Sequence, residues 1–424
     1  MDKDNEINHQ NNEETGVIIE LPVEAVAESK AAKVRRPVGK ARLSGFAYGI
    51  IVILLLMVVY VIADISSGGF IYTANGRFQS SFATDKSADF DVDINALKVY
   101  AFDRYDDGFM LLTENGVSFI DKNGKTVSGQ QLVYSTLSCE ANGNNFAFFD
   151  RGNQSYTLMK NNTVKSQKKI DNKIIDFAVS QKNNYAVVVR DNTKSVLLGY
   201  DSRDEVIYQW DCPKGYITDV TINDSGSKVV ASVLNSVNAV LSSKVYILDF
   251  EYDTAYAEFE YAGETVLGTK FLSDKKILVL TDKNIYRINA KEQEIIYSYG
   301  ASDIAYSSFS DKYAAVVTKD YTHEDSYILT VISNSGKIKY TVNLTGKVCG
   351  LSVSDKSTAV LYDDKTETYS VYGKLVGSIT GLKHFEGIVI NKNFIYVLGT
   401  DSVKRISAYG MNAYETIIPE NETA

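Results

Sequence analysis

The sequence predicts an all-β protein, a β-propeller of about eight four-stranded blades, with seven blades as the alternative. Two observations lead to this prediction. Apolar and polar residues alternate repeatedly in the C-terminal part of the chain, for example in residues 244–250 and 284–288, and this alternation is typical of half-buried strands. A short block also recurs every 40 or so residues, which is roughly the spacing of propeller blades. A separate apolar run near the N-terminus predicts one transmembrane helix before the propeller.

The recurring block consists of a strand, a polar turn and an apolar strand. Three copies share the turn sequence Ser-Asp-Lys, at residues 273–275, 310–312 and 354–356. Candidate first strands begin near residues 97, 135, 173, 216, 265, 303, 346 and 384. Such small sheets bury both faces only against their neighbours, so they are expected to close into a ring. We expect residues 90–94 to close it by adding the outermost strand to the last blade.

Residues 45–63 form a run of 19 residues without a charged side chain. At about 1.5 Å per helical residue the run spans roughly 28 Å, close to the hydrocarbon thickness of a bilayer. We therefore predict a transmembrane helix over residues 45–64. A cleavable signal peptide is the alternative, but 44 residues precede the run, which is long for a signal peptide. The residues expected to anchor the helix in lipid are Ile50, Leu54, Leu55, Leu56 and Val58.

Basic residues precede the predicted helix, and the next basic residue after it is Arg77. Because the basic side of a span stays in the cytoplasm, we expect the N-terminus to be cytoplasmic and the C-terminal domain to be extracellular. The protein is thus expected in the cell membrane as a single-pass protein. The residues that set this topology are Lys33, Arg35, Arg36, Lys40 and Arg42.

The first 44 residues hold 7 basic and 8 acidic side chains, and their low hydrophobicity predicts a disordered cytoplasmic tail. One apolar island, formed by Val17, Ile18, Ile19 and Leu21, is either a docking segment for a cytoplasmic partner or a chance cluster. The predicted organisation is a tail at 1–44, a helix at 45–64, a linker at 65–88, an extracytoplasmic propeller at 89–420 and a C-terminal tail at 421–424.

Composition limits the function classes. A net charge of −9 and a pI near 5.1 argue against a nucleic-acid partner, which requires cations facing phosphates. Three histidines argue against a multi-histidine metal enzyme, and no cofactor is expected. Calcium is the one candidate ion, because residues 103–108 and 121–124 supply several side-chain oxygens. Asp-Gly and Asn-Gly are also preferred in tight hairpins, which is the simpler explanation of both segments.

No catalytic group is assembled in the sequence. His323 and His384 lack a nucleophile motif elsewhere in the chain, and we expect His323 at a solvated hairpin tip. Cys139 and Cys349 fall in predicted first strands, where a free cysteine packs as a small apolar residue. Cys212 precedes Pro213 in a predicted loop and is the one thiol expected to be exposed. Most of the 29 tyrosines are expected to pack between blades.

The basic tail, the single predicted span and the divergent repeats with Ser-Asp-Lys turns resemble a family of uncharacterised, membrane-anchored propeller proteins of clostridia-type Gram-positive bacteria. This resemblance implies a fold and an anchor, and its domain of unknown function implies no activity. More broadly, the repeats are similar to WD40-like and quinoprotein-like propellers. They depart from both, because Trp210 is the single tryptophan and no repeated Gly-His or Trp-Asp signature occurs.

The leading hypothesis is a non-catalytic binding or scaffold module, in which the propeller binds an envelope protein or a cell-wall glycan while the helix sits in the lipid bilayer. The first alternative is a propeller hydrolase or lyase with carboxylates such as Asp106 and Asp107 in a central funnel. The second alternative is a single-pass sensor that signals to the N-terminal tail. Since no catalytic constellation is evident, we expect a protein that is not an enzyme.

Overall fold

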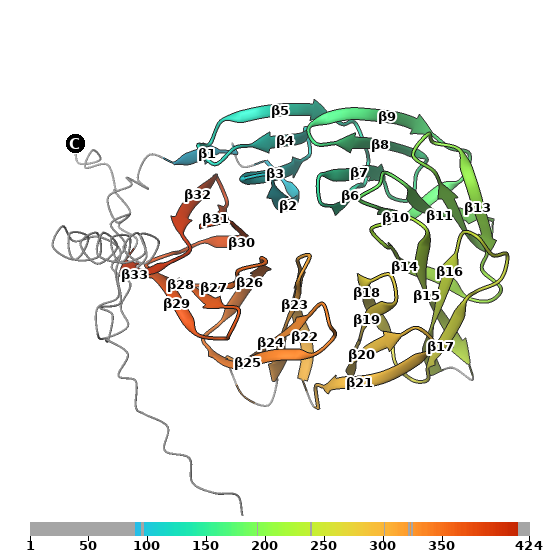
Figure 1. The fold of residues 1–424 in the computed structure, drawn as a ribbon. Coiled ribbons are helices and arrows are strands. Elements are labelled where there is room, and N and C mark those ends of the chain that lie inside the picture. The colour runs from blue at the N-terminus through green and yellow to red at the C-terminus, as the bar shows by residue number, and fades with distance from the viewer. Residues whose placement is uncertain are drawn as a thin grey trace, which may run out of the picture. The chain divides into compact units, whose positions relative to one another are not determined.

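The computed structural model describes residues 90–413, except 95–96, 193, 238–239, 301, 321–322 and 324. These residues form eight sheets, antiparallel except for one added strand, that follow one another around a ring, and within them no helix occurs (Figure 1). None of the described residues therefore belongs to a helix that could cross a membrane. The predicted span at 45–64 lies outside the described residues.

The first four blades each contain four strands in sequence order. Blade 1 has β2 (Val99–Tyr105), β3 (Gly108–Thr113), β4 (Gly116–Ile120) and β5 (Thr126–Gln131). Blade 2 has β6 (Leu137–Asn142), β7 (Asn145–Asp150), β8 (Ser155–Lys160) and β9 (Thr163–Lys169). Blade 3 has β10 (Lys173–Val179), β11 (Tyr185–Asp191), β12 (Lys194–Tyr200) and β13 (Val206–Asp211). Blade 4 has β14 (Tyr216–Ile222), β15 (Lys228–Val237), β16 (Val240–Asp249) and β17 (Ala257–Tyr261).

The remaining blades follow the same order up to the last one. Blade 5 has β18 (Val266–Ser273), β19 (Lys276–Thr281), β20 (Asn284–Asn289) and β21 (Glu292–Ser298). Blade 6 has β22 (Ser302–Phe309), β23 (Tyr313–Asp320), β24 (Ser326–Ser333) and β25 (Ile338–Thr345). Blade 7 has β26 (Val348–Val353), β27 (Ser357–Tyr362), β28 (Lys365–Ser370) and β29 (Leu375–Thr380). Blade 8 has β30 (Phe385–Asn391), β31 (Phe394–Gly399) and β32 (Ser402–Ser407).

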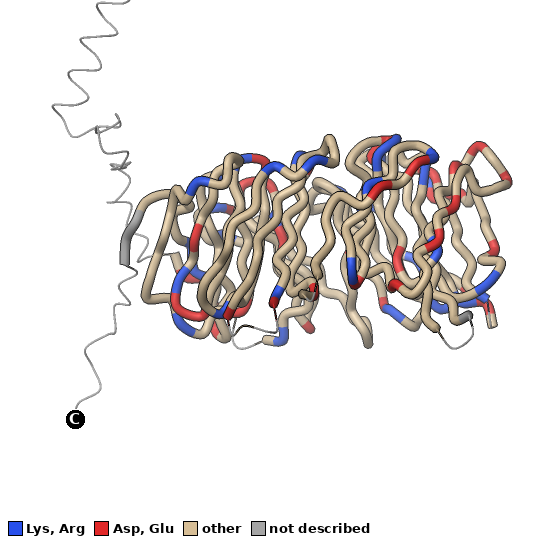
Figure 2. Tube along the Cα trace, turned by 90° about the horizontal axis from the view of Figure 1, so that it is seen from below, with Lys and Arg blue, Asp and Glu red and all other residues tan. Residues whose placement is uncertain are grey.

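The prediction of eight four-stranded blades is confirmed, and each first strand begins within two residues of its predicted start. These first strands, called inner strands below, border the centre of the ring, while the last strand of each blade lies on the rim (Figure 1). Figure 2 shows that the strands run across the thickness of the ring, with basic and acidic residues interspersed.

The fourth strand of blade 8 comes from the start of the described chain. Strand β1 (Asp91–Asp93) pairs antiparallel with β32 through Asp91–Lys404, Val92–Val403 and Asp93–Ser402, as expected for residues 90–94. Phe90 and Ile94 flank the strand and are 5% and 4% exposed. They pack with residues of blades 1 and 8, so β1 joins the beginning of the propeller to its end.

Each pair of neighbouring blades shares one cluster of buried apolar side chains, which gives eight such clusters in the described residues. Strand residues of successive blades interdigitate there, because each sheet presents apolar side chains on both faces. Large tyrosines fill several of these interfaces, as expected from the sequence. Those less than 2% exposed are Tyr156, Tyr185, Tyr362 and Tyr396.

The polar turns that recur in the sequence connect several blades to the next. Asn145 in blade 2 donates from Nδ2 to the carbonyl of Ser180 in blade 3 at 2.7 Å. Asn184 in blade 3 donates to the carbonyl of Gly226 in blade 4 at 3.0 Å, and Asn391 in blade 8 donates to that of Gly108 in blade 1 at 2.8 Å. In the Ser-Asp-Lys turns, the carboxylates accept instead: Asp274 from Asn223 Nδ2 at 2.8 Å and Asp355 from the Lys312 N–H at 3.1 Å.

One strand was not predicted. Strand β33 (Gly410–Ala413) pairs in parallel with β29 and makes blade 7 a five-stranded sheet. A Cβ atom on Gly377 of β29 would lie 2.5 Å from the Ala408 carbonyl oxygen, so the close approach of the C-terminal chain requires glycine there.

The closure of the ring by β1 can be tested with Phe90→Ala. Because the Phe90 ring is buried between blades 8 and 1, its removal should lower the free energy of unfolding by about 3–5 kcal/mol. Urea denaturation followed by circular dichroism measures the change. Val133→Ala is the matched control, since Val133 is 87% exposed and its truncation should change stability by less than about 0.5 kcal/mol. If Phe90→Ala also changes the free energy of unfolding by less than about 0.5 kcal/mol, β1 does not close the ring.

Candidate functional site

All inner strands begin at the same face of the ring, because every blade repeats the same strand order. We call this the start face. In seven of the eight described inner strands the pairing with the second strand skips one residue near the beginning, which is a β-bulge. A bulge leaves its extra residue unpaired and re-aims the side chain. The seven skipped residues, called the bulge ring below, are Tyr100, Ile175, Thr218, Leu267, Ala305, Cys349 and Glu386.

The bulge ring places mostly apolar side chains around the axis of the propeller. Leu267 is 54% exposed and Tyr100 is 39% exposed, although both are large hydrophobic residues. Ile175, Ala305 and Cys349 are half-buried against the interblade clusters. Two further exposed apolar residues belong to the same face, Tyr216 at the start of β14 and Val133 between β5 and β6. Exposed apolar side chains gathered at one face are typical of an interaction surface.

Two tyrosines of the start face each lie under a cation. The Lys98 Nζ is 4.9 Å from the centre of the Tyr100 ring, and the Arg190 guanidinium is 5.7 Å from that of Tyr216. An aromatic face holds a nearby cation through its quadrupole. The start face therefore offers flat apolar surfaces bordered by positive charge, a combination that suits the side chains of a protein partner.

A second group of residues lies on the inner strands of blades 2, 3 and 4. Glu140, Asp176 and Asp219 come from β6, β10 and β14, and Arg151 joins them from the turn after β7. One Arg151 nitrogen donates to Asp176 Oδ1 at 3.0 Å, and the Val220 N–H donates to Asp176 Oδ2 at 3.0 Å. Asp219 Oδ2 accepts from the Thr269 hydroxyl at 2.8 Å. These bonds also tie blade 3 to blade 4 and blade 4 to blade 5.

Burial favours the neutral form of all three carboxyls. Burial, followed by the charges of Asp176 and Asp219, raises the pKa of Glu140 to about 8 against the opposing effect of Arg151 and Lys270. Burial, followed by the Asp219 charge, raises the pKa of Asp176 to about 7 against the opposing effect of Arg151. Burial also raises the pKa of Asp219. Glu140 and Asp176 therefore hold protons near neutral pH that isolated carboxyls would have lost, and the pKa of Asp219 is shifted in the same direction.

The opposite face of the ring is bridged by Arg104 of β2. Its Nη1 donates to the Val353 carbonyl at 2.7 Å and its Nη2 to the Phe309 carbonyl at 2.5 Å. These carbonyls end the inner strands of blades 7 and 6, while Arg104 belongs to blade 1. Because blade 8 separates blade 1 from blade 7, the side chain crosses the centre of the ring. A half-buried, hydrogen-bonded arginine thus links blade 1 to blades 6 and 7 at this face.

The carboxylates expected in a central funnel lie elsewhere. Asp106 and Asp107 form the turn between β2 and β3, which is held by blade 8 through bonds from Asn391 and Tyr396 to backbone carbonyls. Their side chains pair with lysines, Asp107 with Lys122 at 3.4 Å. Among the described residues, no group of three or more histidine, cysteine, aspartate or glutamate side chains could hold a metal ion. The calcium hypothesis therefore gains no site there.

The second suspected calcium segment is a hairpin turn. Asp121 Oδ1 accepts the N–H groups of Asn123 at 2.8 Å and Lys125 at 3.0 Å. The Asp121 carboxylate therefore accepts hydrogen bonds from backbone N–H groups of its own turn, which is the common role of aspartate at such positions.

The histidines and cysteines do not meet in a catalytic group within the described residues. His323 is exposed and its Nδ1 lies 2.9 Å from Asp320 Oδ2, while His384 is exposed in the turn between β29 and β30. Cys139 and Cys349 lie on inner strands and pack on interblade clusters, as predicted. The expectation of an exposed Cys212 is wrong. Its side chain is buried between blades 3 and 4, and burial raises the pKa of its thiol.

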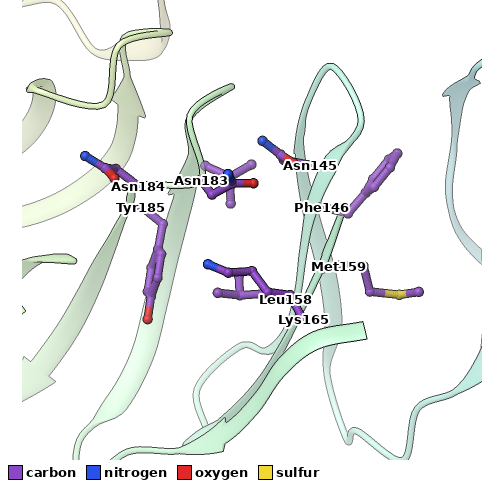
Figure 3. A pocket seen from close by; sticks show the side chains of 9 residues that line it. Asn145, Phe146, Leu158, Met159, Lys165, Asn183, Asn184 and Tyr185 are labelled. Atoms are coloured by element: carbon purple, nitrogen blue, oxygen red, sulfur yellow. The ribbon is translucent and has the colours of Figure 1, made fainter. Parts of the chain in front are cut away.

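A small cavity lies between blades 2 and 3, lined by Asn145, Phe146, Met159, Asn183 and Tyr185 among others (Figure 3). The volume of this cavity is about 20 Å³, and one water molecule needs roughly 10–15 Å³. It has room for about one water molecule and none for an organic ligand.

Three predicted sets of residues lie outside the described part of the chain. They are the membrane anchor around Leu54 to Leu56, the topology-setting basic residues between Lys33 and Arg42, and the tail segment from Val17 to Leu21. Sequence reasoning missed the bulge ring and the buried carboxylates. The sequence does contain a signal for the carboxylates, because an acidic residue interrupts the mostly apolar pattern of β10 and of β14.

The ring of eight blades agrees with comparisons to known proteins. Residues 81–409 match DUF5711, a family of unknown function. The chain belongs to this family. No curated protein matches the DUF5711 chain.

Solved structures share the fold of this DUF5711 protein at low sequence identity. The C-terminal WD40 domain of Sif2 has 12% identity and a TM-score of 0.54, over 76% of this chain and 97% of that chain. A eukaryotic initiation factor has 10% identity and a TM-score of 0.51, over 74% of this chain and 86% of that chain. BamB from Moraxella catarrhalis has 9% identity and a TM-score of 0.44, over 74% of this chain and 98% of that chain. At these identities the likeness shows the propeller fold alone.

The buried carboxyls predict a pH dependence of stability. Between the ordinary carboxyl pKa of the unfolded chain and a pH of about 8, the folded state binds more protons than the unfolded chain. The free energy of unfolding should therefore fall as pH rises through this range. Glu140→Gln removes the charge that forms at high pH. We expect the variant to melt a few degrees above the parent protein at pH 9 and at the same temperature at pH 5, measured by calorimetry. Glu114→Gln, at an exposed position, should change neither value. An equal shift at both pH values would show that Glu140 does not titrate as described.

Proposed function

We propose that this protein is a membrane-anchored, extracytoplasmic β-propeller that acts as a non-catalytic binding or scaffold module for an envelope protein. The observation that supports a binding role most strongly is the start face, where three inner strands and one connection contribute exposed apolar or aromatic side chains. Leu267 and Tyr100 are the centre of this surface, and Lys98 and Arg190 border it. The apolar run at 45–63 and the basic residues before it support the anchoring and the orientation.

A protein partner fits the start face better than a cell-wall glycan does. Protein interfaces bury aromatic and aliphatic anchors and enclose them in a polar border. The bulge ring has this character, since its exposed members include Leu267 and Tyr100, with Thr218 and Glu386 as the polar ones. A wall glycan is retained as the second class of ligand, because tyrosine faces also stack on sugars.

The proposal is tested by crosslinking the full-length protein, tagged at its N-terminus, in its native membrane. We expect the tag to stay with the full-length protein in the membrane fraction, and specific envelope proteins to be captured. The double variant Tyr100→Ser, Leu267→Ser should lose most of that capture, because it removes the two exposed anchors of the start face.

The matched control is the double variant Tyr372→Ser, Ile338→Ser, which removes exposed apolar side chains from the opposite face. It should capture the same proteins as the parent. Equal capture by both double variants would contradict binding at the start face, and release of the tag from the membrane fraction would contradict the anchor. A hydrolytic activity of the full-length protein that depends on Glu140 or Asp176 would favour the propeller enzyme instead.

A further inference from the structure

The outermost strands differ in charge in a way that bears on binding. Six of the eight, β1, β9, β13, β17, β21 and β25, contain at least one charged residue. Charges on an edge strand discourage pairing with another chain. The two exceptions are β5 and β29, which contain no charged residue. Blades 1 and 7 therefore lack the protection that the other edges have.

One of these two edges is occupied. Strand β33 pairs with β29 from Gly377–Gly410 to Thr380–Ala413. The pairing begins directly after a bulge that leaves Val376 of β29 unpaired. An uncharged outer strand of this propeller therefore accepts a short additional strand beyond its bulge.

The other edge has the same construction and carries no additional strand within the described residues. In β5, a bulge leaves Val127 unpaired, so Ser128–Gln131 corresponds to the part of β29 that β33 covers. Val127 is 45% exposed, and β5 pairs only with β4 on its inner side. The Ser128 hydroxyl donates to the Asn162 carbonyl of blade 2 at 2.9 Å, which places the end of β8 and the start of β9 beside this edge.

Positive charge predominates in the segments of blades 1 and 2 beside the β5 edge. Residues 121–131 and 160–169 contain six lysines and one aspartate, a net charge of +5 in a chain whose net charge is −9. Asp107 and Asp204 neutralise some of these lysines. Three others remain exposed, Lys125 before β5, Lys160 at the end of β8 and Lys169 at the end of β9.

We propose that the β5 edge of blade 1 binds an extended, acidic segment of a partner protein, which adds a fifth strand to the blade. The edge supplies unpaired backbone donors and acceptors for the incoming backbone, and the lysines supply charge complementarity. An anionic polymer would match the lysines but not the backbone groups, so a peptide fits better. This site lies on the rim and is independent of the start face.

The test uses the full-length protein in detergent and hydrogen exchange with mass spectrometry. The probes are the peptide Glu-Thr-Val-Glu-Val-Thr-Glu, its counterpart with lysine in place of glutamate, and polyphosphate. We expect the acidic peptide to bind and to slow amide exchange in residues 126–131, and the lysine peptide to have no effect. The double variant Lys125→Glu, Lys169→Glu should weaken binding of the acidic peptide at least about tenfold, since two favourable charges become unfavourable.

The double variant Lys182→Glu, Lys275→Glu is the control, because it makes the same charge change at exposed lysines in turns of the opposite face. It should bind the acidic peptide like the parent. Binding of polyphosphate without slower exchange in 126–131, with no peptide binding, would replace the proposal with an anionic polymer site. Protection, in the protein alone, of the amides of 126–131 that face away from β4 would show that its own chain or a second copy covers the edge. Either result would overturn the proposal while leaving the start-face experiment unaffected.

Discussion

The pairing of β1 with β32 is the constraint on which the rest of the structure depends. Each blade is a small sheet with apolar side chains on both faces, so no blade is stable without a neighbour on each side. Eight clusters fill the eight interfaces, and the one between blades 8 and 1 includes Phe90 and Ile94, which arrive with β1. Closure by the beginning of the chain thus completes the core and ties the two ends of the propeller together.

Closure also fixes the difference between the two faces. All inner strands begin at the start face, where the bulges leave Tyr100 and Leu267 exposed to solvent. At the opposite face the recurring polar turns bond blade to blade, and Arg104 spans the centre. One face is therefore stabilised by internal hydrogen bonds, while the other leaves apolar side chains available to a partner. The buried carboxyls between them make the inner strands of blades 2–4 sensitive to pH.

The blade number and the closing strand could be predicted from the sequence, because alternation and turn residues are local signals that recur at the blade spacing. The individual acidic residues were visible in the sequence but their grouping was not, since Glu140, Asp176 and Asp219 belong to different blades. Strand β33 escaped prediction because Gly410–Ala413 is short and carries no alternation. Cys212 looked exposed beside Pro213, yet blade 4 covers it. Burial of a loop residue depends on the neighbouring blade, which local sequence does not specify.

Hydrogen exchange of β1 tests the closure of the ring most directly. If β1 completes blade 8, the amides of residues 91–94 that face blade 8, such as the Ile94 N–H that donates to the Asp401 carbonyl at 2.8 Å, should be protected and should open together with those of β32, because both strands belong to one cooperative sheet. Exchange of residues 91–94 at the rate of an unstructured chain, with β30–β32 still protected, would contradict the account. The ring would then close without the beginning of the chain, and the core between blades 8 and 1 would need another explanation.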